Sequence, residues 1–257
     1  MSDEPGFSTL RVEVDGRIGR LTLAQPEQLN PLGTRALEEI AAAARWFDET
    51  GASVVVVAGE GRAFSSGFDL REFSGGRGSA DAGRLMAEAL DAMRPLTIAA
   101  VKGHCVGGGV VLAGACDLRI AADDTQFSIP EVDLGIPLAW GGIPRLVREI
   151  GPALTRELVL TCRPFDAEEA RSIGFVNRVV PRADLESSVD QLAEQLARKA
   201  PSVVATTKRQ VNEALEQMAS TQGAWADAIA LGAALADPEA RAAAREYLAS
   251  RGHSARR

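Results

Sequence analysis

Short apolar runs alternate with amphipathic stretches over the first 180 residues. The runs are rich in valine, isoleucine and leucine, as buried strands are, and they cover residues 19–23, 53–57, 97–101, 118–121 and 177–180. Between them, apolar side chains recur at helical spacing, which predicts helices over residues 33–50 and 81–93. Because strands and helices alternate along the chain, we expect an α/β fold with helices packed on a sheet.

The pattern changes near residue 183, where the strand-like runs stop. Helical patterns follow one another over residues 185–199, 203–218, 223–236 and 238–249, and Asp237 and Pro238 are suited to begin the last of them. We therefore divide the chain into a β/α core over residues 1–182 and a helical region over residues 183–257. The alanine-rich faces of the second region are suited to packing against another subunit.

Composition and charge exclude several classes of protein. The chain has 257 residues, of which 46% are hydrophobic and 25% charged, as in ordinary globular proteins. Its net charge of -7 argues against nucleic acid or an anionic membrane as the main partner. No apolar run is long enough to span a bilayer, and the acidic start MSDEPGFSTL does not fit a secretory signal, so we expect a cytoplasmic protein.

The cysteines and histidines do not indicate a metal site. Cys105, Cys116 and Cys162 lie inside apolar runs and have none of the spacings typical of metal ligands. We expect them to be buried thiols in a reducing compartment.

Two glycine-containing loops carry the strongest chemical signal. KGHCVGGGVVLAG, residues 102–114, follows one predicted strand and begins a predicted helix, and GEGRAFSSGFDL, residues 59–70, follows another strand. The first loop has the spacing of neither a dinucleotide nor a nucleoside-triphosphate loop, and the chain contains no GxSxG nucleophile motif, including at AFSSGFD in the second. Either loop alone fits a tight turn. Together, their backbone N–H groups could form an oxyanion hole for a substrate oxygen that gains negative charge.

These loops also resemble a known family. AFSSGFDL and KGHCVGGGVVLAGACDLRIAADDTQFSIPEVDLGI are similar to the two signature segments of the enoyl-CoA hydratase/isomerase family, also called the crotonase family, and the similarity extends over most of residues 10–181. The resemblance implies a crotonase-like spiral of repeated β-β-α turns with a C-terminal helical extension. It also implies a homotrimer or a dimer of trimers. The substrate would be an acyl-CoA thioester, so that coenzyme A belongs to the substrate and no separate cofactor is expected.

The resemblance assigns catalytic roles to three residues. The backbone N–H groups of Phe68 and Gly108 would hold the thioester oxygen, and Glu131, in the PE pair, would be the acid or base. Typical hydratases of the family have a second glutamate, but this chain has Val111 in that place. The position that carries an acid in dienoyl isomerases and dehalogenases is Ala139. Glu131 could instead be merely a solvated loop acid, but its position beside the Ile136-Pro137 turn and the family match favour the catalytic role.

Further residues are implied to contact the substrate. They are Gln28, Leu29, Asn30, Ser66, Gly67, Asp69, Leu70, Arg71, Gly107, Val111, Pro130, Ala139 and Trp140. Arg71 is the candidate for a coenzyme A phosphate, although it could instead pair with Glu72 or another acid. Asp69 and Asp117 also fit turns or salt bridges, and Trp140 fits either the acyl pocket or the core.

The sequence leaves open whether the enzyme isomerises or hydrates an enoyl-CoA, and it also leaves other functions open. A single glutamate can take a proton from one carbon and return it to another, which suffices for double-bond isomerisation of an enoyl-CoA. The same residue could hydrate a 2-enoyl-CoA less efficiently, in fatty-acid or related acyl-CoA metabolism. A non-catalytic acyl-CoA-binding homologue, decarboxylation and thioester hydrolysis are the alternatives. The presence of Glu131 favours an enzyme.

Overall fold

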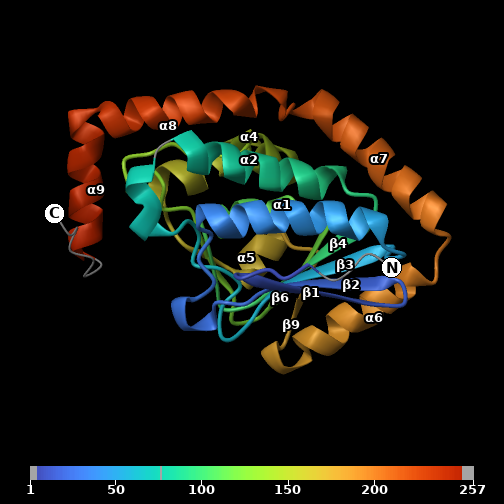
Figure 1. Cartoon of the computed structure of the whole chain (residues 1–257). Coiled ribbons are helices and arrows are strands. Elements are labelled where there is room, and N and C mark those ends of the chain that lie inside the picture. Colours follow the sequence, from blue (N-terminus) through green and yellow to red (C-terminus); the bar gives the residue numbers. More distant parts are fainter. Residues whose placement is uncertain (1–4, 76, 251–257) are drawn as a thin grey trace.

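The computed structural model describes residues 5–75 and 77–250, and a six-stranded sheet runs through the centre of the molecule (Figure 1). Its strands lie in the order β1-β2-β3-β4-β6-β9. They are β1 (Leu10–Asp15), β2 (Ile18–Leu23), β3 (Val54–Gly59), β4 (Leu96–Val101), β6 (Leu118–Ala122) and β9 (Arg178–Val180). β1 and β2 form an antiparallel hairpin, and the other neighbours are parallel. The strands predicted from the sequence are confirmed, and β1 is an addition.

A second, three-stranded sheet lies beside the first. It is formed by β5 (His104–Val106), β7 (Gln126–Ser128) and β8 (Phe165–Asp166), in the order β5-β7-β8. The chain passes from β4 to β5 and then into α3 (Gly108–Gly114), and later from β6 to β7 and on to α4 (Gly142–Thr161). These are the strand-strand-helix turns that the resemblance implies, and they place the loops after β3 and β5 next to each other.

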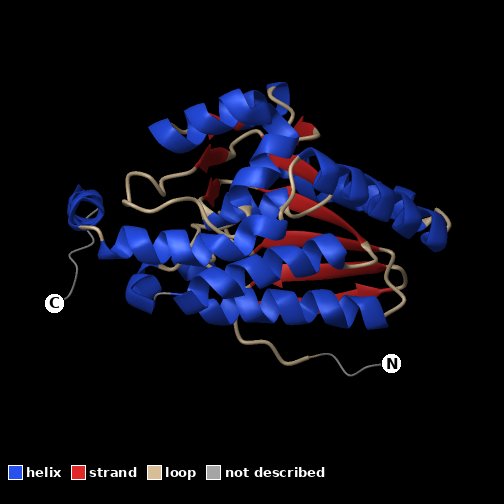
Figure 2. Cartoon of the chain, turned by 90° about the horizontal axis from the view of Figure 1, so that it is seen from above, coloured by secondary structure: helices blue, strands red, loops and turns tan. Residues whose placement is uncertain are grey.

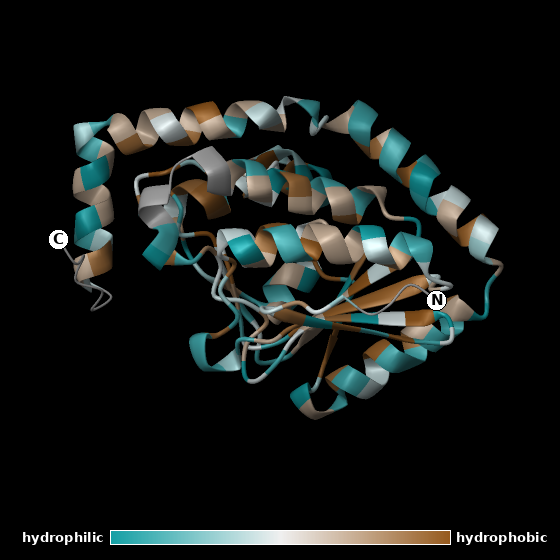
Figure 3. Ribbon diagram, in the orientation of Figure 1, coloured by the Kyte–Doolittle hydropathy of each residue, from teal (hydrophilic) through white to brown (hydrophobic). Residues whose placement is uncertain are grey.

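Helices cover both faces of the large sheet, because the central strands are apolar on both sides. Val55 and Val57 of β3 belong to the core that includes α1 (Thr34–Glu49) and α2 (Arg77–Ala92). Val54 and Val56 point the other way and pack with α6 (Leu185–Ala197). Figure 3 shows the contrast between the hydrophobic strands and the mixed faces of the helices. β3 is therefore buried on both faces, as its almost uniformly apolar sequence requires.

The helices after α6 run along the outside of the molecule (Figures 1 and 2). They are α7 (Pro201–Met218), α8 (Asp227–Ala236) and α9 (Pro238–Ser250), while the short α5 (Ala167–Ser172) lies inside the first region. Asp237, which directly precedes α9, accepts a hydrogen bond from the Ala240 amide and so caps the helix, as predicted. Buried Lys208 fastens α7 to the core by an ion pair with Asp117, at 2.9 Å.

The helical region therefore begins with a helix that packs on the sheet, and only its later part is an outer layer. The division at residue 183 and the trimeric assembly stay predictions. The three cysteines are buried and unpaired, as expected. Within residues 5–75 and 77–250, no helix has the length and apolar character needed to cross a membrane.

Candidate active site

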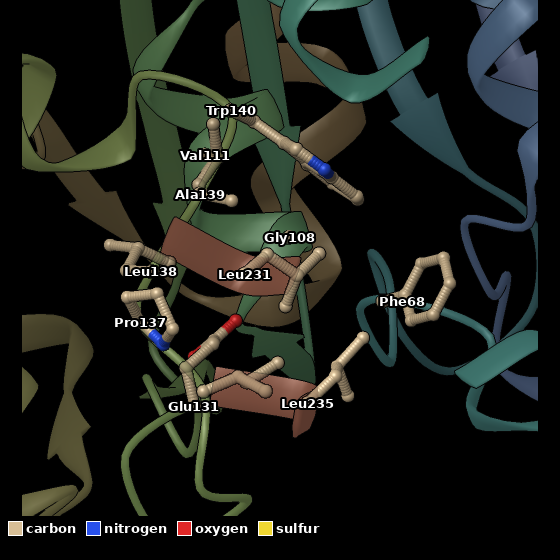
Figure 4. A pocket seen from close by; sticks show the side chains of 11 residues that line it. Phe68, Gly108, Val111, Glu131, Pro137, Leu138, Ala139, Trp140, Leu231 and Leu235 are labelled. Atoms are coloured by element: carbon tan, nitrogen blue, oxygen red, sulfur yellow. The ribbon is translucent and has the colours of Figure 1, made fainter. Parts of the chain in front are cut away.

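A small apolar pocket lies where the loops after β3, β5 and β7 meet α8 (Figure 4). Its volume is about 50 Å³, measured as the space that the centres of water-sized spheres can occupy. The pocket is lined by Phe68, Gly108, Val111, Glu131, Ile136, Pro137, Leu138, Ala139, Trp140, Leu231 and Leu235. The structure thus brings together six of the residues named from the sequence, including the proposed catalytic set of Phe68, Gly108 and Glu131.

The two glycine-containing loops are joined by their backbones. The amide of Val106 donates to the Ser65 carbonyl at 3.1 Å, and the amide of Ser65 donates to the His104 carbonyl at 3.0 Å. Gly67 has a φ of +85°, and a Cβ there would lie within 3.0 Å of the Val106 carbonyl and 3.5 Å from the amide nitrogen of Gly108. Only glycine permits this approach without strain.

The amides of Phe68 and Gly108 remain available to a ligand. Each follows a glycine of positive φ, Gly67 or Gly107, at the edge of the pocket. Within the described part of the chain, neither amide donates to a protein acceptor. Two unpaired backbone donors beside a pocket are the arrangement that an oxyanion hole requires.

Glu131 lies directly against the second of these loops. Gly107, whose amide donates to the Ser128 carbonyl at 2.8 Å, has a φ of +50°. A Cβ on Gly107 would come within 3.0 Å of the Glu131 carboxylate. The glycine therefore lets the carboxylate lie beside the start of α3.

The environment of Glu131 raises its pKa. The residue is only 8% exposed, so it is not a solvated loop acid, and its Oε2 has no hydrogen-bond partner among the described residues. Burial disfavours the charged form and raises the pKa of Glu131 from 4.5 to about 7. A carboxyl group with a pKa near neutrality is suited both to accept and to donate a proton.

Glu131 is the only ionisable side chain among the described residues that line the pocket. Val111 and Ala139, at the two positions where relatives can carry a further acid, contribute only hydrocarbon. Asp133, two residues after Glu131, is exposed. Among the described residues of the lining, Glu131 is therefore the only side chain suited to carry a proton.

Asn30 connects the segment before α1 to the loop after β3. It is 1% exposed and has a φ of +54°. Its Oδ1 accepts from the Gln25 amide, and its Nδ2 lies 2.9 to 3.3 Å from the carbonyls of Glu60, Ala63 and Phe64. The side chain is thus engaged within the protein, where it holds the segment before α1 against the loop after β3.

Replacing Asn30 with alanine is expected to lower the free energy of unfolding by roughly 3 kcal/mol, because several buried backbone groups lose their partner. Denaturant unfolding measures this change. Replacing exposed Gln28 with alanine is the matched control and should change stability by less than about 0.5 kcal/mol. Equal stabilities of the two variants would contradict the positioning role.

The other residues expected at the coenzyme end lie near the surface. Gln28 is exposed, Leu29 has a φ of +61°, and the Ser66 hydroxyl donates to the Gln28 carbonyl at 3.4 Å. Leu70 begins a short 3-10 helix after the Phe68 loop, and Pro130 is buried beside Glu131. Contacts of these residues with coenzyme A stay predictions.

Arg71 pairs with an acid, and that acid is Asp69. The guanidinium binds both carboxylate oxygens of Asp69, at 2.7 to 3.1 Å, and the hydrogen bonds from Arg71 lower the pKa of Asp69. Glu72 instead accepts hydrogen bonds from Thr34. Arg71 is 67% exposed, so its contact with a phosphate stays a prediction.

Several residues of the site were missed by sequence reasoning. Ile136, Pro137 and Leu138 follow Glu131 closely in the sequence, and this proximity could have indicated that they line the same pocket. Leu231 and Leu235 are one helical turn apart on α8, but only the tertiary structure places that helix over the pocket. Among the described residues, no cluster of histidine, cysteine, aspartate and glutamate is suited to bind a metal ion.

Comparison with known proteins identifies the family. Residues 13–252 match the family described as Enoyl-CoA hydratase/isomerase. The chain belongs to the enoyl-CoA hydratase/isomerase family. A probable enoyl-CoA hydratase of Mycobacterium bovis is 37% identical over 219 residues, which cover 83% of this chain and 85% of that protein. The peroxisomal Delta(3,5)-Delta(2,4)-dienoyl-CoA isomerase of Arabidopsis thaliana is 34% identical over 218 residues, covering 77% of this chain and 78% of that protein.

Solved structures of the enoyl-CoA hydratase/isomerase family share the fold. An enoyl-CoA hydratase/isomerase from Xanthobacter autotrophicus superposes with a TM-score of 0.87 at 30% identity, over 96% of this chain and 95% of the other. The crotonase-like fold and the family predicted from the two signature segments are therefore confirmed. Relatives with different activities share this fold, so the reaction has to be argued from the pocket.

Proposed function

We propose that this enzyme shifts the double bond of a 3-enoyl-CoA to give the 2-enoyl-CoA, with Glu131 as its only acid and base. The observation that carries the proposal is the isolation of Glu131 in an otherwise apolar pocket, within reach of a site between two free backbone donors. Isomerisation adds and removes no atoms, so one group can complete it.

The reaction proceeds in two proton transfers. The Glu131 carboxylate removes a proton from C2 of the substrate, and the electron pair left behind moves toward the thioester oxygen. The N–H groups of Phe68 and Gly108 stabilise the negative charge on that oxygen. The protonated Glu131 then gives its proton to C4, the charge returns from the oxygen, and the double bond lies between C2 and C3.

Hydration of a 2-enoyl-CoA is the second candidate, because relatives such as the Mycobacterium bovis protein carry the name enoyl-CoA hydratase. Hydration needs a water molecule held and deprotonated beside C3 while C2 receives a proton. Val111 offers no hydrogen bond to such a water, and the pocket lining supplies no other charged group in the described residues. This favours isomerisation over hydration.

The two reactions are distinguished by assaying 3-enoyl-CoA isomerisation and 2-enoyl-CoA hydration on the same preparation with substrates of equal chain length. We expect isomerisation to exceed hydration by at least about 10², the contribution of one positioned acid or base. A preparation that binds acyl-CoA but catalyses neither reaction would instead indicate a non-catalytic binding protein.

The pH dependence of isomerisation should report the pKa of Glu131. The reaction begins with the carboxylate form, so kcat/KM should rise with pH and level off above an apparent pKa of about 7. Initial rates of isomerisation across this range measure the profile. A midpoint near 4.5, the ordinary value for glutamate, would show that burial does not control the catalytic group.

A further inference from the structure

Trp140 has an unusual backbone conformation at one end of the pocket. Its φ is +64°, which is uncommon for a bulky residue and is often found at functional sites, and its side chain is only 6% exposed. Hydrogen bonds from two different helices hold the backbone of residues 140–141 in this conformation. The Trp140 carbonyl accepts from Arg145 at 3.2 Å, and the amide of Gly141 donates to Asp227, the first residue of α8, at 2.8 Å.

The indole fits between two glycines from different helices. A Cβ on Gly83 of α2, or on Gly108 at the start of α3, would lie closer than 3.0 Å to ring atoms of Trp140. The ring also meets Phe68 edge-on, with the centroids 6.2 Å apart and the planes at 79°. Trp140 therefore contacts both residues whose amides are proposed to hold the thioester oxygen.

Glu131 and Trp140 contact consecutive glycines at the start of α3. Gly107 is in contact with the Glu131 carboxylate and Gly108 with the Trp140 indole, and Figure 4 shows Gly108 between the two side chains. Val111, Ala139 and Leu231 also line the pocket, and Figure 4 shows Val111 and Ala139 near Trp140 and Leu231 between Trp140 and Glu131. A hydrocarbon chain that leaves the reacting carbons along these apolar residues meets the indole.

We infer that Trp140 is a specificity-determining residue that ends the acyl pocket and restricts the enzyme to short-chain acyl-CoA thioesters. The pocket leaves only about 50 Å³ to the centres of water-sized spheres, and the buried indole lines it at this end, so a chain that extends in this direction meets the ring. The indole packs directly against the backbone of Gly83 and Gly108, because the ring occupies the volume where side chains of these residues would be. This packing holds the ring in its position. The inference rests on the proposed function only in taking an acyl-CoA as the ligand.

The test measures the binding of saturated butanoyl-, octanoyl- and dodecanoyl-CoA to the full-length protein by calorimetry, which requires no turnover. Wild type should bind butanoyl-CoA more tightly than dodecanoyl-CoA. In Trp140→Gly, where glycine adopts the positive φ without strain, the ratio of dodecanoyl to butanoyl affinity should rise at least about tenfold, since each additional buried methylene group is worth roughly fourfold.

A second variant tests whether Trp140 ends the acyl pocket without removing the tryptophan. Gly83→Ala should push the indole into the pocket and weaken octanoyl-CoA binding relative to butanoyl-CoA. Gly223→Ala is the matched control, because no atom lies within 4 Å of its added Cβ, and it should leave the ratio unchanged. If Trp140→Gly does not fold, the ratio of octanoyl-CoA to butanoyl-CoA affinity in Gly83→Ala and Gly223→Ala tests the inference instead. Equal ratios in these two variants would overturn it.

The inference is overturned if Trp140→Gly changes the affinity for all three ligands by one common factor, as a purely structural role would. It is also overturned if wild type binds dodecanoyl-CoA as tightly as butanoyl-CoA. Failure of the proposed reaction gives a different result: the dependence of binding on chain length would be present while isomerisation is absent. A lack of binding by every acyl-CoA would refute both.

Discussion

Replacing Glu131 with glutamine is expected to lower kcat for double-bond isomerisation by about 10² to 10⁴, because the pocket loses its only proton carrier. Glutamine has nearly the same shape and should leave the backbone donors of Phe68 and Gly108 in place. Affinity for saturated acyl-CoA should therefore stay within a few-fold of wild type. Steady-state kinetics and calorimetry on the same preparations measure the two effects.

The same variant should be more stable than wild type at high pH. The pKa of Glu131 is raised from 4.5 to about 7 in the folded protein, so folding favours the protonated form. That contribution is fully present below pH 4.5 and is lost as the pH rises through about 7; the complete loss corresponds to about 3 kcal/mol. Glutamine cannot ionise, so Glu131→Gln should exceed wild type in free energy of unfolding at high pH.

Two outcomes would count against this account of Glu131. Full isomerase activity in Glu131→Gln would mean that another group moves the proton. An identical dependence of unfolding free energy on pH in the two proteins would mean that the carboxyl group is not buried as described. Denaturant unfolding at pH values below and above 7 provides the second comparison.

Replacing Val111 with glutamate is expected to raise hydration of a 2-enoyl-CoA by about 10² or more, because it supplies a second group that can hold and deprotonate water. Val111 is 3% exposed and tightly packed, since a Cβ on Gly142 would lie 2.9 Å from its Cγ2. The new carboxyl group should therefore also lower the stability of the protein, by roughly 2 kcal/mol.

Val111→Gln is the matched control for that experiment. Glutamine has the size and polarity of the new side chain but cannot act as a base, so hydration should stay near the wild-type level. If Val111→Glu and Val111→Gln hydrate at the same rate, the missing carboxyl group does not explain the preference for isomerisation. Assays at equal concentrations of folded protein separate this result from a loss of stability.

Much of the fold follows from local patterns. The run SVVVV is apolar as buried strands are, and Val54 to Val57 alternate between two cores on either side of β3. The three-stranded sheet was not predicted, because β5, β7 and β8 contain only two or three residues each and such short strands depend on their neighbours. The sequence pattern assigned α6 to the C-terminal helical region, although in the structure this helix packs on the sheet.

The candidate site was predictable only where its residues are close in sequence or belong to a signature segment. Phe68, Gly108, Val111 and Glu131 were named and lie together in one pocket. The burial of Glu131 and the proximity of Leu231 could not be inferred, because both depend on how distant segments pack. Asn30 was named as a substrate contact, which stays a prediction; its side chain bonds to the backbone of the neighbouring loop, and that contact could not be inferred from the sequence.

In the proposed reaction one buried carboxyl group carries a proton from C2 to C4, and an isotope label at C2 follows this transfer. A 3-enoyl-CoA carrying deuterium at both C2 hydrogens is converted in ordinary water at low conversion, and the product is analysed by NMR. Because Glu131 is only 8% exposed, the account predicts that a measurable fraction of the product carries deuterium at C4. Product with only hydrogen from water at C4 would contradict it.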